Sequence, residues 1–313
     1  MQQGNQTTIS EFILLGLSSE MEKESLLFVL FLGMHLVTVA GNGLIILAIA
    51  RDTGLHTPMY LFLANLSFAD ISSSSTSIPK MLMNIQTKSQ SISYSSCITQ
   101  MYFSIVFTVI DNFLLGVMAY DRFVAICHPL NYTTIMHPML CILLTVIPWV
   151  LSNIVALTHT LLLIQLVFCD SNTIPHFFCD LAPLLKLSCS DATVNELVLL
   201  VVGLLVIIFP FAVILFSYIY IIRAVLRLLS LERKWKAFST CTSHLTVLLL
   251  FYGTIVGVYF FPLSTHPEDT DKIGAVLFTV VTPMVNPFIY SLRNKDMNSA
   301  LRKLISKKRG SSL

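Results

Sequence analysis

Charged side chains are scarce in this chain of 313 residues. Asp, Glu, Lys and Arg together make up 12% of the sequence, whereas soluble domains usually carry about 25%. Hydrophobic residues make up 55%, and the mean hydropathy is +0.78. This composition excludes an ordinary soluble domain and indicates a protein that crosses the membrane several times. The net charge of +2 gives no reason to expect a nucleic-acid partner.

The chain also lacks features that other classes of membrane protein need. Its apolar segments carry no activated nucleophile and no cluster of metal ligands, which argues against an intramembrane enzyme. It has no internal repeat with matched broken helices, so a transporter stays open only as the weaker alternative. Residues 1–23 lack a basic start followed by an apolar core, so we expect the first helix to act as an uncleaved anchor.

Seven apolar segments divide the chain. Each is near or above the roughly 20 residues that a helix needs to cross a bilayer. The segments lie at 25–50, 58–84, 97–127, 140–162, 194–224, 237–262 and 272–292. We therefore predict an all-α membrane protein, a seven-transmembrane helix bundle over residues 25–292. Residues 1–24 precede this bundle, and residues 293–313 are predicted to form a short amphipathic eighth helix with a basic tail.

Basic residues indicate how the bundle is oriented. If the N terminus lies outside, fourteen of the nineteen Lys and Arg residues fall on the cytoplasmic side. Since Lys and Arg favour cytoplasmic loops, the N terminus is predicted to be extracellular and the C terminus cytoplasmic. The basic tail is then expected to face anionic membrane lipid.

An acid and a base stand side by side where the third apolar segment leaves the membrane. They are Asp121 and Arg122, within the stretch Met118–Cys127. A charge inside hydrocarbon is costly and is retained only with a partner or a function. We expect Asp121 to restrain Arg122 in one state and to release it toward a partner protein in another. This is the pattern of a switch, not of a catalytic pair.

The seventh segment contains a polar turn with a proline. Pro287 frees a carbonyl and bends a helix, and Asn286 can hydrogen-bond the exposed backbone. Tyr290, four residues after Asn286, lies on the same helical face. The pattern indicates a hinge, and a purely structural bend is the alternative.

Two acids lie in the middle of predicted membrane helices. Asp111 is eleven residues before Arg122, or about 16 Å along a helix, and Asp70 lies in the second segment. Both carboxylates cannot stay charged at this depth without a cation, so a bound ion and a protonated hydrogen-bond network are the two alternatives. Hard oxygen ligands favour a small cation. The predicted sodium site consists of Asp70, Asp111, Asn42, Ser67 and Asn286.

One face of the third segment connects the outer side with the inner side. Ser104, Thr108 and Asp111 follow the spacing i, i+4, i+7, and Arg122 lies five helical turns after Ser104. A ligand pocket is expected in the outer half of the bundle, lined by hydroxyls, one amide and apolar groups but no fixed charge, which suits a small neutral or weakly polar molecule. Its candidate residues are Ser104, Ile105, Thr108, Asn112, Val202, Val206, Tyr252, Ile255, Val256 and Tyr259.

Cysteine placement agrees with the predicted orientation. Four cysteines, Cys97, Cys169, Cys179 and Cys189, fall on the outer, oxidising side, which allows two disulfides. Bridges there would fix the long fourth-to-fifth loop as a lid. Asn5 begins an Asn-Gln-Thr glycosylation acceptor in the exposed N-terminal segment.

Four motifs together resemble those of mammalian odorant receptors of the tetrapod type, within the rhodopsin-like receptor superfamily. They lie at Leu55–Tyr60, Met118–Cys127, Lys236–Cys241 and Pro283–Asn294. The resemblance covers almost the whole chain, from about residue 5 to 303. The sequence between Cys169 and Cys189, which contains His-Phe-Phe-Cys-Asp, resembles the second extracellular loop of this family.

The resemblance implies roles for further residues. It pairs Cys97 with Cys179 and Cys169 with Cys189. It implies that Asp121 and Arg122 rearrange on activation and that two tyrosines then meet Arg122. The implied activation switch comprises Asp121, Arg122, Tyr218, His244, Asn286, Pro287 and Tyr290.

The resemblance also implies partners and a location. It implies a small volatile odorant, a stimulatory heterotrimeric G protein of the olfactory type that raises cyclic AMP, helper proteins for trafficking, and the plasma membrane of olfactory cilia. A rhodopsin-like receptor for another small neutral ligand outside the nose is the alternative. Two residues depart from the family pattern: Phe123 stands where Tyr is frequent, and Thr242 stands where Gly is frequent.

Overall fold

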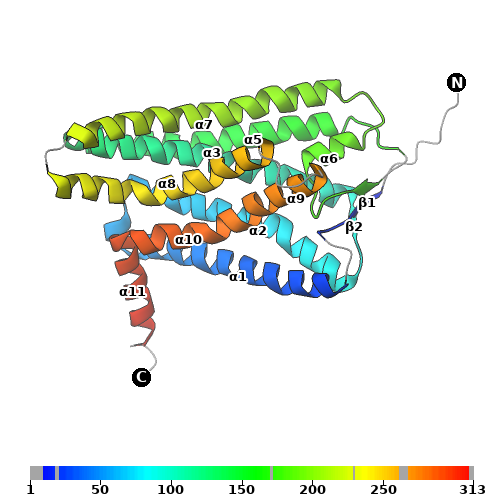
Figure 1. Cartoon of the computed structure of the whole chain (residues 1–313), viewed down its shortest axis with the longest axis horizontal. Coiled ribbons are helices and arrows are strands. Elements are labelled where there is room, and N and C mark those ends of the chain that lie inside the picture. The colour runs from blue at the N-terminus through cyan, green and yellow to red at the C-terminus, as the bar shows by residue number, and fades with distance from the viewer. Residues whose placement is uncertain (1–9, 18–20, 170–171, 228–229, 261–266, 310–313) are drawn as a thin grey trace.

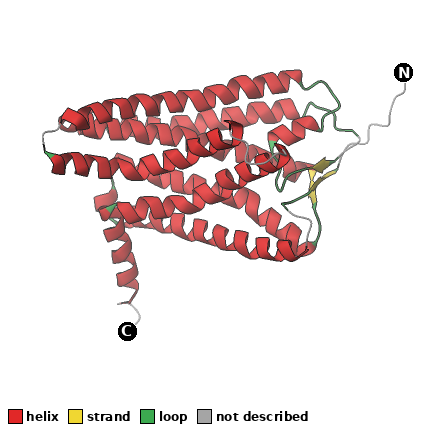
Figure 2. Ribbon diagram, viewed as in Figure 1, coloured by secondary structure: helices red, strands yellow, loops and turns green. Residues whose placement is uncertain are grey.

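Long helices lying side by side make up most of the molecule (Figures 1 and 2). The computed structural model describes residues 10–17, 21–169, 172–227, 230–260 and 267–309. The spans are α1 (Met21–Arg51), α2 (Pro58–Thr87), α3 (Tyr94–Cys127), α5 (Pro138–Leu163), α7 (Thr193–Arg227), α8 (Leu231–Phe260) and a last, irregular span of α9 (Pro267–Val276), the π-helical turn η3 (Leu277–Val281) and α10 (Thr282–Arg293). The predicted seven-helix bundle is confirmed.

Five of the described helices are long and apolar enough to cross a membrane by length and composition: α1, α3, α5, α7 and the last span from Lys272 to Tyr290. The remaining two are less apolar. In α2 a buried Asp70 and a run of serines at 72–75 lower the hydropathy. In α8 the apolar stretch is shorter, Cys241–Val256. Asp70, Ser73 and Ser74 are buried in the interior of the bundle, where neighbouring helices can supply partners.

α3 occupies the centre of the bundle. It packs against α2, α5, α7 and α8, and its apolar stretch is the most buried of the five. By contrast, α7 exposes large apolar side chains such as Phe209 and Phe216. An exposed apolar ridge suits hydrocarbon as the surrounding medium. The central position lets α3 contact both the outer cavity and the inner face.

Two helix contacts are close because one partner is glycine. A Cβ atom on Gly41 of α1 would lie 2.9 Å from Cβ of Pro287 in α10, and a Cβ atom on Gly116 of α3 would lie 3.3 Å from Cβ of Pro210 in α7. Both prolines lie inside their helices. The seventh span is irregular at η3 and contains Pro287 inside α10. α1 packs closely against it at Pro287.

A small sheet covers the outer end of the bundle (Figure 1). Its strand order is β2-β1-β3, with β1 at Glu11–Leu14, β2 at Ser91–Ser93 and β3 at Thr173–Ile174. β1 pairs antiparallel with β2 and parallel with β3. Phe12 of β1 is fully buried and packs against Tyr94 and Phe168. The N-terminal segment is thereby joined to both neighbouring outer loops.

The inner end carries short elements and a final helix. They are η1 (Thr53–Leu55), η2 (Pro129–Asn131), α4 (Tyr132–Ile135) and α11 (Lys295–Arg309). α11 turns away from the bundle at the end opposite the sheet (Figure 1). Lys303 of α11 forms an ion pair with Asp52, N to O 2.9 Å, and this interaction lowers the pKa of the exposed Asp52 carboxyl. The predicted eighth helix is therefore present and attached to the first inner loop.

Candidate functional site

A cavity of about 520 Å³ lies in the outer half of the bundle. Its size is in the range of small-molecule sites. Five of the predicted pocket residues line it: Ser104, Thr108 and Asn112 of α3, Val206 of α7 and Ile255 of α8. The three α3 residues recur at four-residue intervals, so one helical face supplies them all.

Asn112 forms the polar floor of this cavity. Its Nδ2 donates a hydrogen bond of 2.6 Å to the Val206 carbonyl, and its Oδ1 accepts one of 2.6 Å from the Tyr252 hydroxyl. Three helices, α3, α7 and α8, are therefore joined at one amide. Tyr252 itself packs against Phe211 and Phe251, so it positions the floor without lining the cavity.

The structure does not place four other predicted residues in the cavity lining. Ile105 packs into the core around α3, Val202 is half-buried, and Val256 is exposed on the outside of α8. Tyr252 lies beneath the floor, as described above. Helical phase explains these corrections, because a residue one position from the cavity-facing side points about 100° away. The side chain of Tyr259 lies outside the described residues.

The second outer loop supplies residues that the sequence prediction missed. They are His176, Phe178, Asp180, Ala182 and Pro183. The disulfide between Cys97 and Cys179 holds this loop against the outer end of α3, and a second disulfide joins Cys169 to Cys189. Both bridges have the pairing that the family resemblance implied. The His-Phe-Phe-Cys-Asp sequence was the available signal for this part of the site.

Asp180 changes the expected chemistry of the pocket, because the predicted lining contained no charged group. Its carboxylate also accepts a hydrogen bond of 2.9 Å from the Leu181 amide, at the start of α6 (Leu181–Lys186). The other missed lining residues come from the helices. They are Gly203 and Ile207 of α7, Phe251 of α8, and Gly274, Ala275, Phe278 and Thr279 of the seventh span.

His176 is the buried polar group of the loop. Its ring lies 4.7 Å from the Phe177 ring and 4.6 Å from the Phe178 ring, centroid to centroid. The side chain is 3% exposed, and its Nδ1 has no hydrogen-bond partner among the residues that the structure describes. Burial, together with the nearby charge of Lys272, lowers the pKa of His176 to about 4. A neutral imidazole therefore faces the cavity at physiological pH.

A polar centre lies deeper in the bundle, between α1, α2, α3 and α10. Asn286 donates hydrogen bonds of 3.1 and 2.9 Å to the two carboxylate oxygens of Asp70. Asn42 donates to the Thr38 and Pro283 carbonyls. Asp70 and Asp111 interact electrostatically.

Several oxygens of this polar centre have no donor in the described part of the chain. These buried acceptors are Oδ1 of Asn42, Oδ1 of Asp111 and Oδ1 of Asn286. Ser67 is buried in α2, three residues before Asp70. These are hard oxygen donors, so the residues fit a small cation.

At the inner end, Asp121 and Arg122 each contact a side chain of another element. The Tyr132 hydroxyl of α4 donates a hydrogen bond of 2.7 Å to Asp121, and the Arg122 guanidinium contacts the Met59 sulfur of α2. No ion pair joins these two described side chains. Neighbouring residues on a helix do not face each other, which accounts for the separate partners.

The other switch candidates gather around Arg122. The Tyr218 hydroxyl and Nδ1 of His244 are 2.8 Å apart in a hydrogen bond between α7 and α8. The Tyr290 hydroxyl of α10 is buried and forms no hydrogen bond with the other described side chains. Arg122 interacts electrostatically with both tyrosines. The inner ends of α3, α7, α8 and α10 therefore meet at one polar cluster.

The two departures from the family pattern lie at the same inner end. The Phe123 ring contacts Tyr220 of α7 at 5.8 Å and His128 at 5.5 Å, centroid to centroid. It is a packing residue between α3 and α7. Thr242 is half-buried in α8. The predicted glycosylation site at Asn5 lies outside the described residues.

The chain resembles known proteins over nearly its whole length. The family model described as olfactory receptor matches residues 31–308. Human Olfactory receptor 1S1 is 80% identical over 98% of this chain and 95% of that receptor, and human Olfactory receptor 1S2 is 77% identical over the same shares. Rat Olfactory receptor 1f45 is 58% identical over 98% of both chains. Squid rhodopsin has the same fold, with a TM-score of 0.70, 17% identity and coverage of 92% of this chain and 87% of that one.

Proposed function

The chain belongs to the olfactory receptor family of rhodopsin-like membrane receptors. From this premise we propose that it detects a small, mostly apolar volatile molecule in the cavity of the outer half of the bundle. The observation that carries the proposal is the cavity of about 520 Å³ closed by the disulfide-bound loop and floored by Asn112. Apolar walls with a few polar groups select such a ligand. Family membership makes the chain a multi-pass receptor with a small-molecule ligand and a G-protein partner, not an enzyme.

The proposed signal passes along helices that contribute residues both to the cavity and to the inner polar cluster. α3 contributes Thr108 and Asn112 to the cavity and Arg122 to the inner cluster. α8 contributes Ile255 to the cavity and His244 to the inner cluster. A ligand that prefers one position of α8 shifts the population of the inner arrangement. The inner face then binds a stimulatory G protein of the olfactory type, which raises cyclic AMP.

The proposed location follows from the same family. We propose the plasma membrane of olfactory cilia, reached with helper proteins for trafficking. The basic α11 lies against anionic lipid at the cytoplasmic surface, because its Lys and Arg residues are attracted to that leaflet.

A cyclic AMP assay tests this function. Cells that express the chain with the olfactory G protein and trafficking helpers should respond to a member of an odorant panel. Thr108→Leu should change the effective odorant concentration about tenfold or more, since one methyl-scale change in a pocket is worth about 1–3 kcal/mol. Val256→Leu, outside the cavity, is the matched control.

Other outcomes point elsewhere. Response only to non-volatile neutral ligands would favour a receptor that works outside the nose. Silence toward all ligands, together with substrate flux in a transport assay, would overturn the receptor proposal in favour of a transporter.

We also propose that the polar centre around Asp70 holds a sodium ion. Its support is the set of oxygens on Asn42, Asp111 and Asn286 that have no hydrogen-bond donor among the described residues. Replacing choline chloride by sodium chloride should raise the melting temperature of the purified receptor, because a ligand that binds the folded state stabilises it. Asp70→Asn should remove this effect, and Asp52→Asn at the inner surface should not. An equal sodium effect in both variants would refute the site, and no effect in the wild type would favour a protonated network.

A further inference from the structure

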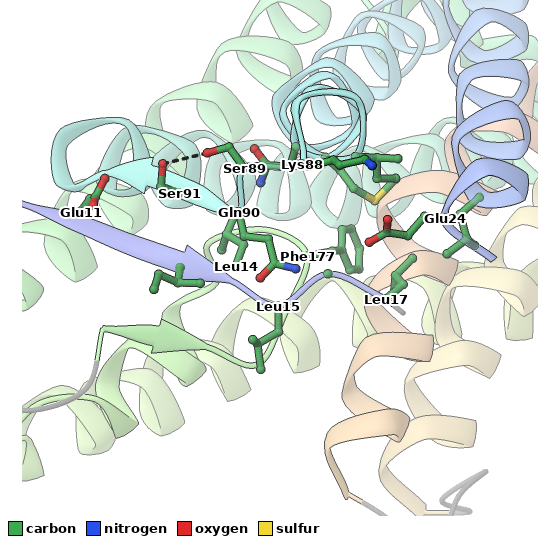
Figure 3. A pocket seen from close by; sticks show the side chains of 16 residues that line it. Glu11, Leu14, Leu15, Leu17, Glu24, Lys88, Ser89, Gln90, Ser91 and Phe177 are labelled. Carbon is green, nitrogen blue, oxygen red and sulfur yellow. Dashed lines mark hydrogen bonds between the residues drawn. The ribbon is translucent and has the colours of Figure 1, made fainter. Parts of the chain in front are cut away.

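A second pocket, which we call the outer pocket, lies at the outer end of α1 and α2. It is separate from the cavity of about 520 Å³ described above, which we call the deep cavity. The outer pocket has a volume of about 410 Å³. Figure 3 shows it between the chain that follows β1, at Leu15 and Leu17, and the turn before β2, at Lys88 to Gln90. The size is again within the range of small-molecule sites.

The lining of this pocket has an apolar part and a charged part. Leu27 of α1 and Ile85 of α2 belong to the apolar part. The charged part consists of two carboxylates, Glu11 and Glu24, and one ammonium, Lys88, so the described lining carries a net negative charge. In Figure 3 the Glu24 carboxylate points toward the Phe177 ring, and Glu11 lies at the other end of the pocket.

Asn84 adds an unused acceptor to this lining. It projects from α2, one turn before Lys88, and its Oδ1 is buried and accepts no hydrogen bond from any described residue. A buried acceptor without a donor is destabilising. Carboxylate and amide oxygens both accept hydrogen bonds, so the pocket is complementary to a molecule that donates them. The apolar part requires that this molecule also have a hydrocarbon body.

The two pockets share one wall, made of the loop residues His176, Phe177 and Phe178. Phe177 lines the outer pocket, whereas the two residues beside it line the deep cavity. The Phe177 ring lies 4.7 Å from His176 and 4.9 Å from Phe178, centroid to centroid, and Phe177 is 1% exposed. Close packing of this kind transmits a displacement instead of absorbing it.

Leu15 and Gly16, which follow β1 and line the outer pocket, are hydrogen-bonded to the same loop. The Leu15 amide donates to the Ile174 carbonyl at 3.1 Å, and the Gly16 amide donates to the His176 carbonyl at 3.3 Å. Gly16 has a φ of 70°, a left-handed conformation that glycine adopts without strain. A molecule in the outer pocket therefore contacts the wall of the deep cavity in two ways, directly at Phe177 and through Leu15 and Gly16.

We propose that the outer pocket is a second ligand site, which takes a small protonated amine with an apolar body and alters ligand binding in the deep cavity. The ammonium binds Glu24 and the Asn84 amide oxygen, and the hydrocarbon body packs against Leu27, Ile85 and Phe177. The coupling of the two sites rests on the proposed function of the deep cavity. The binding itself does not.

Direct binding tests the site without any odorant or G protein. The probe is cyclohexylamine, measured by saturation-transfer NMR on the full-length receptor in lipid nanodiscs, with empty nanodiscs as the blank. Cyclohexylamine should bind at least tenfold more tightly than the neutral cyclohexanol, because only the ammonium carries a charge opposite to that of the Glu24 carboxylate. This comparison needs no variant. Equal binding of the two compounds would overturn the proposal.

Variants locate the bound amine. Glu24→Gln and Ile85→Trp should each weaken cyclohexylamine binding about tenfold or more. Glu196→Gln, an exposed outer acid of α7, and Thr108→Leu in the deep cavity should leave it unchanged. Loss only in the Thr108 variant would assign the amine to the deep cavity and overturn the outer site.

A response assay tests the coupling. With an odorant agonist from the panel, saturating cyclohexylamine should shift the half-maximal odorant concentration at least fivefold in the wild type, a usual size for coupled sites. The shift should disappear in Glu24→Gln. Binding without any shift would refute the coupling, whereas failure of the odorant response itself would concern only the proposed function.

Discussion

At the scale of single residues, four sites contain a buried polar atom that has no hydrogen-bond partner within the described ranges. They include Oδ1 of Asn84 in the outer pocket, Nδ1 of His176 in the loop, Oδ1 of Asp111 in the polar centre and the Tyr290 hydroxyl at the inner end. Leaving such an atom unpaired is destabilising by about 1–3 kcal/mol. Each atom lies where we propose that an amine, an odorant, an ion or a rearranging Arg122 meets the receptor, so each has a candidate partner.

His176 gives the receptor a stability that depends on pH. Its folded-state pKa of about 4 lies below the model-peptide value of 6.5, so the unfolded chain binds the additional proton between these values. Stability should therefore fall as the pH is lowered from about 6.5 to 4, by at most about 1.4 kcal/mol per pH unit. Melting temperatures of the purified receptor over this range measure the effect.

The matched variant for this prediction is His176→Gln, which keeps a neutral polar side chain. It should show a shallower loss of stability on acidification than the wild type. His128→Gln, an exposed histidine at the inner end, should leave the slope unchanged. Equal slopes in the wild type and His176→Gln would contradict the assignment.

Helical periodicity explains which site residues were predictable. Ser104, Thr108 and Asn112 follow from the fixed spacing along one helix, and the structure places all three in the cavity. Asp180 and His176 come from an irregular loop, whose path no periodicity describes. The Asp121 and Arg122 side chains took partners from α4 and α2, which only the packing of those elements could determine.

At the scale of elements, the contact between α1 and α10 depends on the absence of a side chain at Gly41. A Cβ atom there would lie 2.9 Å from Pro287, whereas a Cβ atom at Gly43 would meet nothing within 4 Å. This contact supports the irregular seventh span at the bend next to Asn286. Small residues let helices approach this closely in membranes.

Gly41→Ala should therefore destabilise the receptor, whereas Gly43→Ala should not. Overpacking of this kind is destabilising by about 1–3 kcal/mol. Gly43→Ala should be neutral or slightly stabilising, since alanine favours a helix by up to about 1 kcal/mol relative to glycine. Thermal unfolding of both purified variants measures the difference. A melting temperature for Gly41→Ala at or above that of Gly43→Ala would contradict this account.

At the scale of the whole molecule, the outer lid unites three distant parts of the chain. β1 pairs with β2 of the first outer loop and β3 of the second. Cys97 and Cys179 then join this assembly to α3. The fully buried Phe12 packs inside the same cluster. The lid is therefore one unit that covers both proposed ligand sites.

The two disulfides should contribute unequally to stability. Cys97 and Cys179 are separated by 82 residues, and Cys169 and Cys189 by 20. Closing the longer loop should stabilise the fold by roughly 1 kcal/mol more. Replacing each pair by serine should lower the melting temperature, and the loss should be larger for the first pair. A larger loss for the second pair would contradict the expected order.

The sequence by itself determined the seven spans, their orientation and the family. Each span needs about 20 apolar residues, and the Lys and Arg residues lie mainly on one side, so composition along the chain is sufficient. It also determined the α3 residues of the cavity, because a helix has a fixed period.

Only the tertiary structure decided how the loops close the outer end. The strands β1, β2 and β3 span four residues or fewer, too few for a periodic pattern to predict them. Their pairing, the wall around Phe177 and the outer pocket depend on contacts between residues far apart in the chain. The partners of Asp121 and Arg122 depend on such contacts too, since side-chain direction and neighbouring helices decide which groups meet.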